Sequence, residues 1–491
     1  KSIQQTDMLP MMFNTIGVSD GMSMGTLGMR YSLPSRDLIA DSIETIVNAQ
    51  HYDGVVCIPG CDKNLPGSLI ALSRLNRPGL IVYGGSMKPS YYNGDKLDIV
   101  SAFESYGKYV KGTISEEERL NIIQNSCDKE CGSCSGLYTA NTMAICLETM
   151  GITLPNSSSV PSMSQEKLTE CDNIGLYMKT MLEKDIKPKD IITKKAFENA
   201  ISMLYITGGS TNAVIHLLSI AKSIGIELTI EDFKNKEHVP VLLNMKPNGP
   251  NVMYDLHTIG GTSALLKYLI LNNVIDGNCL TVSGDTLWGN VQDASDLDFS
   301  KQNIVYPLEH PIKADSHVKI LKGNLAPDGC LSKIYKTDQN FVGKAIVFDS
   351  ETEMVKALAR DEITKDNFVI LRYQGETIGC PEMLTPTSSL IGYFGENPPP
   401  LATDGRFSGG SHGILVAHLS DAYKQEGLTH LIENGDNIVI NLKNHEINLD
   451  IDEPEIKKRR EKSIKRDPNI NGYLLKYSKL CGNFSNGYLA E

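Results

Sequence analysis

In the first part of the chain, short continuous apolar runs alternate with segments whose apolar residues recur at helical spacing. Residues 54–58 and 80–83 are short apolar runs of the kind that form buried strands, and 13–18 is a third predicted strand. Residues 37–50 and 65–75 instead carry apolar residues at helical spacing. Further helices are expected over 102–111, 139–150, 196–205 and 213–224. Because short strands separated by helices are typical of parallel sheets, this part predicts a largely parallel sheet covered by helices.

The pattern changes beyond about Pro311, where strands follow one another with one clear helix, over 350–360, among them. The predicted strands cover 317–321, 344–349, 367–373, 437–442 and 446–449. We therefore expect an α/β protein with an α/β domain over 1–310 and a mostly β domain over 311–491. Residues 452–465 are strongly charged, which predicts a solvated helix near the end of the chain.

Composition narrows the class of protein. A chain of 491 residues is long enough for two or three domains, and a net charge of -12 disfavours nucleic acid as a partner. No apolar run approaches the ~18 residues of a membrane span. Eleven cysteines are too few, and an odd number, for a secreted disulfide framework. In a reducing, intracellular compartment, clustered cysteines indicate metal or redox chemistry instead.

Two cysteines lie shortly before predicted helices. Cys61 follows a predicted strand and precedes the helix at 65–75, and Cys134 precedes the helix at 139–150. Backbone N–H groups and the helix dipole stabilise thiolates at such positions. A pair of thiolates there can hold a soft metal or an iron–sulfur cluster. The alternative interpretation is that each cysteine is a small buried apolar residue.

Three carboxylates, Asp20, Asp62 and Glu382, are candidate magnesium ligands, because an oxygen-rich magnesium site draws carboxylates from separate loops. Lys63 directly follows Asp62. As an ammonium group it would repel a metal ion, so it is a candidate ligand only after carbamylation makes it an anion. Otherwise we expect it to be the counter-ion of Asp62.

Ser408 lies in a glycine-rich turn, where a serine can approach a substrate and a nearby cation would lower its pKa toward the alkoxide. The turn does not fit a nucleophile elbow, since Arg406 stands where that pattern has glycine. His412 is only four residues along in the same turn, so a serine–histidine triad is not evident either. A glycine–serine turn with a purely structural role is the alternative.

Other segments have competing interpretations. Residues 208–212 could cradle a phosphate, but they lack the lysine of a P-loop and are more typical of a helix cap, with Ser210 or Thr211 leading into the helix. His216, on an apolar helix, is expected to be a core histidine. Cys127, Cys131 and Cys134 have C-x3-C-x2-C spacing, similar to radical S-adenosylmethionine enzymes, and the last two also form a thioredoxin-like C-x-x-C. The radical S-adenosylmethionine motif is usually followed by a glycine-rich cofactor strand, which the sequence does not show here, and a thioredoxin-like pair leaves Cys61 and the carboxylates without a role.

Taken together, the segments resemble the dihydroxy-acid dehydratase family, which also includes sugar-acid and 6-phosphogluconate dehydratases. The matching segments are NTIGVSDGMSMG (14–25), YSLPSRDLIA (31–40), CDKNLPG (61–67), GSCSGLYTANTM (132–143), GGSTNAVIHL (208–217), GNLAPDG (323–329) and TDGRFSGGSHG (403–413). Each is a modest signal alone, but in this order they run through nearly the whole chain.

The resemblance implies an α/β/α domain, a barrel-like second domain and specific roles for matching residues. The implied ligands of a [2Fe-2S] cluster, or a [4Fe-4S] cluster in some members, are Cys61 and Cys134. The implied magnesium ligands are Asp20, Asp62, Glu382 and Lys63 in carbamylated form. Ser408 would be the base that removes the C2 proton of the substrate. Cys127 and Cys131 then lose their claim to a cluster.

The implied reaction is the dehydration of 2,3-dihydroxy-isovalerate and 2,3-dihydroxy-3-methylvalerate to 2-keto acids in branched-chain amino-acid biosynthesis. Residues 64–66 and 82–86 look more similar to these enzymes than to sugar-acid dehydratases. Aldonate or 6-phosphogluconate dehydration, or a non-catalytic relative without a cluster, are the alternatives. We expect a homodimer or larger homo-oligomer, in the cytoplasm of a bacterium or the mitochondrial or plastid matrix of a eukaryote.

The chain departs from the family in two places. It begins at Lys1, after the segment in which the family carries its third cluster cysteine, so we expect a fragment. In addition, the stretch YQGETIGCPE (373–382) is about two residues shorter than usual before the metal glutamate. This puts the reach of Glu382 in question.

Overall fold

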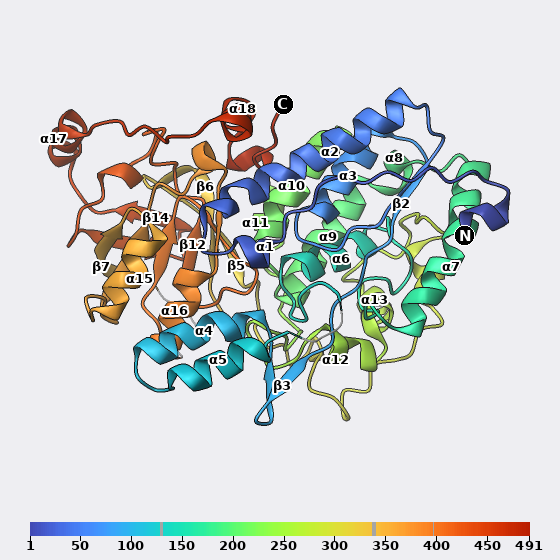
Figure 1. Ribbon diagram of the computed structural model, residues 1–491, viewed down its shortest axis with the longest axis horizontal. Helices are drawn as coiled ribbons and strands as arrows, with labels where there is room; N and C mark the ends of the chain where they lie inside the picture. Colours follow the sequence, from blue (N-terminus) through green and yellow to red (C-terminus); the bar gives the residue numbers. More distant parts are fainter. Residues whose placement is uncertain (128–130, 336–339, 396) are drawn as a thin grey trace. The chain divides into compact units, whose positions relative to one another are not determined.

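The computed structural model describes residues 1–127, 131–335, 340–395 and 397–491, and the chain forms two compact units (Figure 1). The first unit comprises residues 1–19, 35–90 and 127–316, and the second comprises 20–34, 91–126 and 317–491. Each unit thus draws on separate stretches of the chain. The division predicted at residue 310 stays a prediction about domains.

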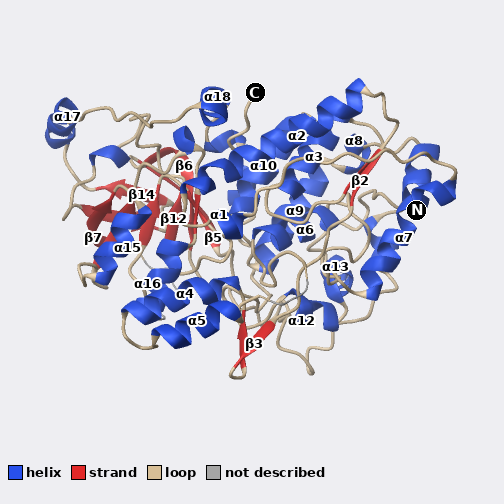
Figure 2. Ribbon diagram, viewed as in Figure 1, coloured by secondary structure: helices blue, strands red, loops and turns tan. Residues whose placement is uncertain are grey.

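The first unit is largely helical and contains a small parallel sheet (Figure 2). Its strands are β1 (Val55–Cys57) and β2 (Gly79–Ile81). The helices that lie wholly or mainly in it are α2 (Ser32–Ala49), α3 (Asn64–Leu75), α6 (Thr139–Thr149), α7 (Gln165–Glu183), α8 (Pro188–Ile191), α9 (Lys194–Thr207), α10 (Asn212–Ile224), α11 (Ile230–Asn235), α12 (Met253–Thr258), α13 (Gly261–Leu271) and α14 (Leu287–Val291).

Helix α3 is the crossover between β1 and β2, which pair in parallel with Val56 opposite Leu80. An isolated parallel bridge from Ile81 to Thr153 extends the pairing. Gly67 on α3 allows α2 to approach closely, because a β-carbon there would lie 2.7 Å from the Arg36 carbonyl oxygen. Helices therefore cover this sheet. The chain beyond the end of β1 carries Cys61, and the chain beyond the end of β2 carries Tyr83.

The second unit is built on a closed barrel, whose strands are drawn in red in Figure 2. Its strand order is β10-β12-β6-β5-β14-β13-β7-β8. The strands of this unit are β4 (Asp95–Leu97), β5 (Val318–Gly323), β6 (Ala326–Lys333), β7 (Phe341–Phe348), β8 (Asn367–Leu371), β9 (Glu382–Met383), β10 (Leu401–Thr403), β11 (Arg406–Phe407), β12 (Leu415–Ala417), β13 (Asn437–Asn441) and β14 (Glu446–Leu449), and β3 (Ser90–Tyr92) pairs with β4. Its helices are α1 (Asp20–Ser23), α4 (Ile99–Val110), α5 (Glu116–Gln124), α15 (Glu351–Ala359), α16 (Thr385–Phe394), α17 (Glu453–Lys462) and α18 (Gly472–Leu480).

Alternate residues of β8 face opposite sides of the barrel wall, as the two-residue period of a strand requires. Phe368 and Ile370 belong to one apolar cluster with residues of the other barrel strands. Val369 and Leu371 belong to a second cluster, together with residues of α15 and α16. Both faces of this parallel strand are buried, which explains its continuous apolar sequence.

The predicted α/β class, with a parallel sheet first and a barrel later, is confirmed. The strand predicted over 13–18 is wrong, because residues 8–19 have no regular secondary structure and Phe13 and Ile16 are exposed. An apolar run forms a strand only where another strand is available to pair with it. Among the described residues, no helix is both long and apolar enough to cross a membrane.

Candidate active site

Cys61 and Cys134 lie on loops of the first unit that are tied together. Cys61 lies four residues beyond the end of β1, and the Ser133 hydroxyl donates to the Gly60 carbonyl oxygen beside it. On the Cys134 side, the Asn141 side-chain amide donates to the carbonyl oxygen of Cys134 at 2.6 Å. Asn141 is itself held by the Tyr83 hydroxyl at 2.8 Å. Both thiols are partly exposed, so their loops could present them to a shared ligand.

The pKa of the Tyr83 phenol is sensitive to the charge around these thiols. Burial raises the pKa of its phenol well above its ordinary value, and the nearby Cys134, Cys61 and Asp62 raise it further. Cys57 differs from Cys61, because burial, only partly offset by a hydrogen bond with Ser68, raises the pKa of its thiol to about 12. Cys57 is therefore a neutral thiol in the core. The two partly exposed thiols fit an iron–sulfur cluster, whose ligands are thiolates.

Lys63 and Asp62 begin the segment that leads into α3. Lys63 is 1% exposed, and its Nζ lies 3.5 Å from Oδ2 of Asp62, so the predicted counter-ion contact is present. Carbamylation would turn this buried cation into an anion, the charge that a ligand of a divalent metal needs.

Asp20 and Glu382 come together within the second unit. Each has a carboxylate oxygen within 4.8 Å of the other's, and both residues are buried. The Ser32 hydroxyl donates to Oδ1 of Asp20 at 2.7 Å. Two buried carboxylates repel each other unless a cation lies nearby. This donor set of hard oxygen atoms fits magnesium.

The cation that the sequence interpretation missed is Arg406. It forms a buried ion pair with Glu382, and it also donates from Nε to the Cys380 carbonyl oxygen at 2.8 Å and from Nη2 to the Ser32 hydroxyl at 3.3 Å. Its position two residues before Ser408 in TDGRFSGG was the available signal, whereas Ser32 offered none.

The short stretch before Glu382 still brings this residue into the second unit's interior. Cys380, two residues earlier, has a left-handed φ of 46°, and Glu382 then enters β9, which pairs in parallel with β11. Glu382 lies directly opposite Arg406 in that pairing and is 1% exposed.

Ser408 follows the last residue of β11 and is partly exposed. Its N–H donates to the Met383 carbonyl oxygen at 3.1 Å, which extends the contact with β9 by one residue. The Gly410 N–H donates to the Ser408 hydroxyl oxygen at 3.4 Å, and the Ser411 N–H donates to the Ser408 carbonyl at 2.9 Å. Ser408 is thus held in a tight turn in which the Gly410 N–H faces its side chain.

The remaining candidates are two exposed cysteines, a core histidine and a serine that accepts a hydrogen bond at the start of a helix. Cys127 and Cys131 are exposed, and the residues between them lie outside the described part of the chain. His216 is fully buried on α10, with Nδ1 3.4 Å from Nη1 of Arg36, as expected of a core histidine. Before α10, the Ser210 hydroxyl accepts from the Asn212 N–H at 3.2 Å.

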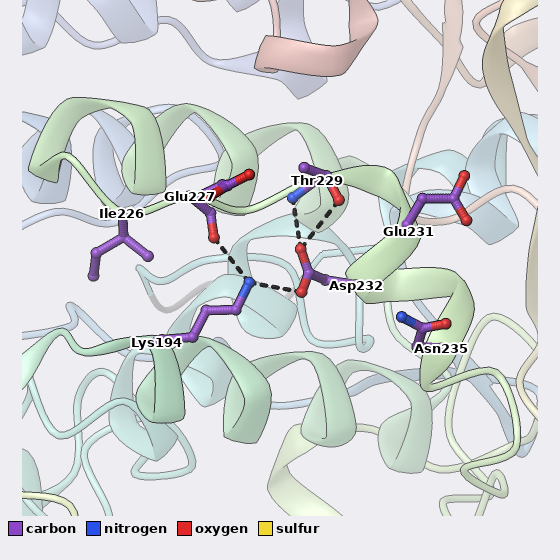
Figure 3. A pocket seen from close by; sticks show the side chains of 7 residues that line it. All are labelled: Lys194, Ile226, Glu227, Thr229, Glu231, Asp232 and Asn235. Atoms are coloured by element: carbon purple, nitrogen blue, oxygen red, sulfur yellow. Dashed lines mark hydrogen bonds and ion pairs between the residues drawn. The ribbon is translucent and has the colours of Figure 1, made fainter.

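The first unit also has an open hollow with a volume of about 620 Å³, and none of these candidates lines it (Figure 3). It is lined by Lys194, Ile226, Glu227, Thr229, Glu231, Asp232 and Asn235. Lys194 donates to Asp232 at 2.6 Å and to the Glu227 carbonyl oxygen at 2.8 Å, and Asp232 also accepts from Thr229. These contacts join the start of α9 to α11, which is a structural role.

Known proteins match the whole chain. The model of the dihydroxy-acid/6-phosphogluconate dehydratase N-terminal domain matches residues 1–290, and that of the C-terminal domain matches 303–488. A dihydroxy-acid dehydratase of Francisella tularensis subsp. novicida is 48% identical over 495 residues, which cover 100% of this chain and 88% of the relative. The mitochondrial dihydroxy-acid dehydratase of Saccharomyces cerevisiae is 48% identical over 100% of this chain and 86% of its own length. That of Lactococcus lactis subsp. lactis is 49% identical over 100% and 87%. The chain therefore belongs to the dihydroxy-acid/6-phosphogluconate dehydratase family.

Proposed function

We propose that this chain is a hydro-lyase that dehydrates 2,3-dihydroxy acids to 2-keto acids. Its substrates are 2,3-dihydroxy-isovalerate and 2,3-dihydroxy-3-methylvalerate, the precursors of valine, leucine and isoleucine. The observation that carries the proposal is the pair of buried carboxylates Asp20 and Glu382, with Ser408 emerging from the strand that pairs with Glu382's strand. The full-length similarity to proteins named dihydroxy-acid dehydratase supports the substrate.

The proposed cofactors follow from the donor atoms. Oxygen ligands for magnesium come from Asp20, Asp62, Glu382 and carbamylated Lys63. Thiolates for a [2Fe-2S] cluster, or a [4Fe-4S] cluster, come from Cys61 and Cys134. When bound, magnesium supplies Lewis acidity at the substrate's carboxylate and C2 hydroxyl, and the cluster supplies it at the C3 hydroxyl.

Ser408 acts as the base in this proposal. Its hydroxyl oxygen, deprotonated as an alkoxide, takes the proton from C2, while the C3 hydroxyl leaves as hydroxide with the electrons of its bond to carbon. Transfer of the proton from Ser408 to that hydroxide releases water and restores the alkoxide. The resulting enol tautomerises to the 2-keto acid. The Gly410 N–H donates toward the Ser408 oxygen and so favours its charged form. Arg406 orients Glu382 through its ion pair.

The test is made on the complete protein, purified without oxygen. Its visible spectrum, iron and sulfide are measured, and keto-acid formation from 2,3-dihydroxy-isovalerate is followed with magnesium. We expect a coloured protein with turnover, and Ser408→Ala to lower kcat by roughly 10²–10⁴-fold. Ser389→Ala removes a buried hydroxyl that has no hydrogen-bond partner among the described residues, so this matched control should keep its kcat.

The same experiment separates the alternatives. Turnover of an aldonate or of 6-phosphogluconate, but not of 2,3-dihydroxy-isovalerate, would keep the chemistry and replace the substrate. A colourless protein without turnover, even after cluster reconstitution, would favour a non-catalytic relative. Radical S-adenosylmethionine and thioredoxin-like chemistry have no support in the family assignment.

We also propose a homodimer or larger assembly in an intracellular, reducing compartment. The structure describes all eleven cysteines and none of them is in a disulfide bond, which supports the compartment. Large apolar side chains such as Met12, Met22 and Leu27 are highly exposed, which supports an assembly. Sedimentation of the purified protein tests the assembly, and a monomer at micromolar concentration would contradict it.

A further inference from the structure

Lys333 is a buried lysine at the end of barrel strand β6. It pairs with Leu415 of β12 on one side and with Val318 of β5 on the other, and it is 4% exposed. An ammonium group removed from water requires hydrogen-bond acceptors or an opposite charge. Among the residues that the structure describes, no carboxylate forms an ion pair with Lys333, and burial lowers its pKa to about 7.

Both acceptors of Lys333 belong to the turn that carries Ser408. The ammonium nitrogen donates to the Ser411 carbonyl oxygen at 2.8 Å and to the Gly409 carbonyl oxygen at 3.5 Å. These carbonyls lie one and three residues beyond Ser408. A side chain from a different barrel strand therefore holds the far side of the turn in place.

The peptide unit between Gly409 and Gly410 connects Lys333 to Ser408. In a trans peptide the carbonyl and the N–H point in opposite directions. The Gly409 carbonyl faces the Lys333 ammonium, while the Gly410 N–H donates to the Ser408 hydroxyl oxygen at 3.4 Å. A cation at the carbonyl end polarises the peptide and strengthens its N–H as a donor.

We propose that Lys333 is a positioning residue for Ser408, because it aims and polarises the Gly410 N–H that stabilises the serine oxygen as an alkoxide. This inference rests on the proposed role of Ser408 as the base. It adds a group that does not touch substrate but sets how readily the base forms. A lysine that merely closes the end of the barrel would support folding and leave proton removal unchanged.

The test compares Lys333→Met with the wild type in the complete, loaded enzyme. The substrate is 2,3-dihydroxy-isovalerate with hydrogen or deuterium at C2. We expect kcat to fall by about 10²-fold, as for loss of one oxyanion-hole donor, with little change in KM. We also expect the deuterium isotope effect on kcat to increase, since proton removal becomes slower relative to other steps.

Two further variants keep the inference open to contradiction. In Lys333→Ala, added propylammonium should restore part of kcat by occupying the space of the lost side chain. The neutral molecule of similar size, 1-propanol, should not. Lys236→Met is the matched control, because Lys236 is a half-buried lysine of the first unit that donates to the Ser202 hydroxyl at 3.1 Å. It should keep both kcat and the isotope effect.

The outcomes distinguish the inference from the function on which it rests. A folded Lys333→Met enzyme with wild-type kcat and isotope effect would overturn the role of Lys333, provided that Ser408→Ala is inactive. Loss of kcat with an unchanged isotope effect and no rescue would likewise overturn it and leave a structural lysine. Full activity of Ser408→Ala, or no turnover by the wild type, would instead overturn the base assignment and the inference with it. If Lys333→Met does not fold, the same criteria apply to Lys333→Gln, which retains a neutral donor.

Discussion

At the scale of single residues, the site depends on charges that are buried in compensating sets. Asp20 and Glu382 lie within 4.8 Å of each other, and Arg406 is the cation paired with Glu382. The hydroxyl of Ser32 contacts both Asp20 and Arg406, so the carboxylates and the guanidinium form one network. A buried network of this kind tolerates the loss of one member poorly, because the remaining charge has no water to solvate it.

Replacing Arg406 by methionine should destabilise the protein strongly. The variant leaves the buried Glu382 carboxylate without its counter-ion, and breaking such a pair costs about 3–5 kcal/mol of unfolding free energy. Denaturant unfolding of the metal-free protein measures this. Arg360→Met breaks an ion pair with Glu362 on the surface and should leave the unfolding midpoint unchanged. Equal midpoints for the wild type and the Arg406 variant would contradict the network.

His418 should make stability depend on pH. Burial, and to a lesser extent the charge of Arg406, lower the pKa of this imidazole to about 3. His418 also stacks on Phe484 and contacts the Tyr488 hydroxyl at 3.0 Å. Because the folded state holds the neutral form, its contribution is complete above the unfolded pKa of about 6.5 and is lost as pH falls toward 3.

The measurement is the unfolding free energy of wild type and His418→Gln between pH 7 and pH 4. The variant should show a shallower decrease over this range, whereas His51→Gln, at an exposed position, should follow the wild type. Parallel curves for wild type and His418→Gln would show that His418 does not carry this pH dependence.

At the scale of elements, the stability of the second unit depends on the apolar side chains that the barrel strands bury together. Phe368 on β8 is fully buried in the barrel cluster and packs edge-on against Phe341, with ring centroids 5.7 Å apart. Phe368→Ala should lower the free energy of unfolding by about 3–5 kcal/mol through lost burial and a residual cavity. Val342 on β7 is 61% exposed, so Val342→Ala should change the free energy of unfolding by less than about 0.5 kcal/mol. Chemical denaturation compares the two, and similar losses would argue against an apolar barrel interior.

The elements also explain which segments the apolar pattern could predict. Helices α3, α9 and α10 were expected within a few residues of their observed bounds, because their apolar periodicity matches their burial. Strands β10 and β12 were missed, since each has only three residues, too few for a period to be visible. They exist because neighbouring barrel strands supply their hydrogen-bond partners.

At the scale of the whole molecule, activity should require both the proposed thiolate ligands and the proposed divalent cation. Cys61→Ser and Cys134→Ser should each lose most of the visible absorption and the keto-acid turnover, because a hydroxyl is a poor ligand for iron in a cluster. Cys131→Ser, at an exposed position outside the proposed ligand set, should retain both. Loss of colour in Cys131→Ser would restore the C-x3-C-x2-C hypothesis.

Chelation of magnesium should abolish turnover reversibly without bleaching the protein.

By itself the sequence determined the fold class, the family and the candidate ligands. Apolar periods reflect burial along one element, and motifs such as CDKNLPG and TDGRFSGGSHG are contiguous, so both are legible without coordinates. The tertiary structure alone decided which distant groups meet. Ser32 contacts Asp20 and Arg406 although 374 residues separate it from Arg406, and Lys333 reaches the turn of Ser408 from another strand. Such contacts depend on strand pairing and chain reversal, and no local period or spacing records them.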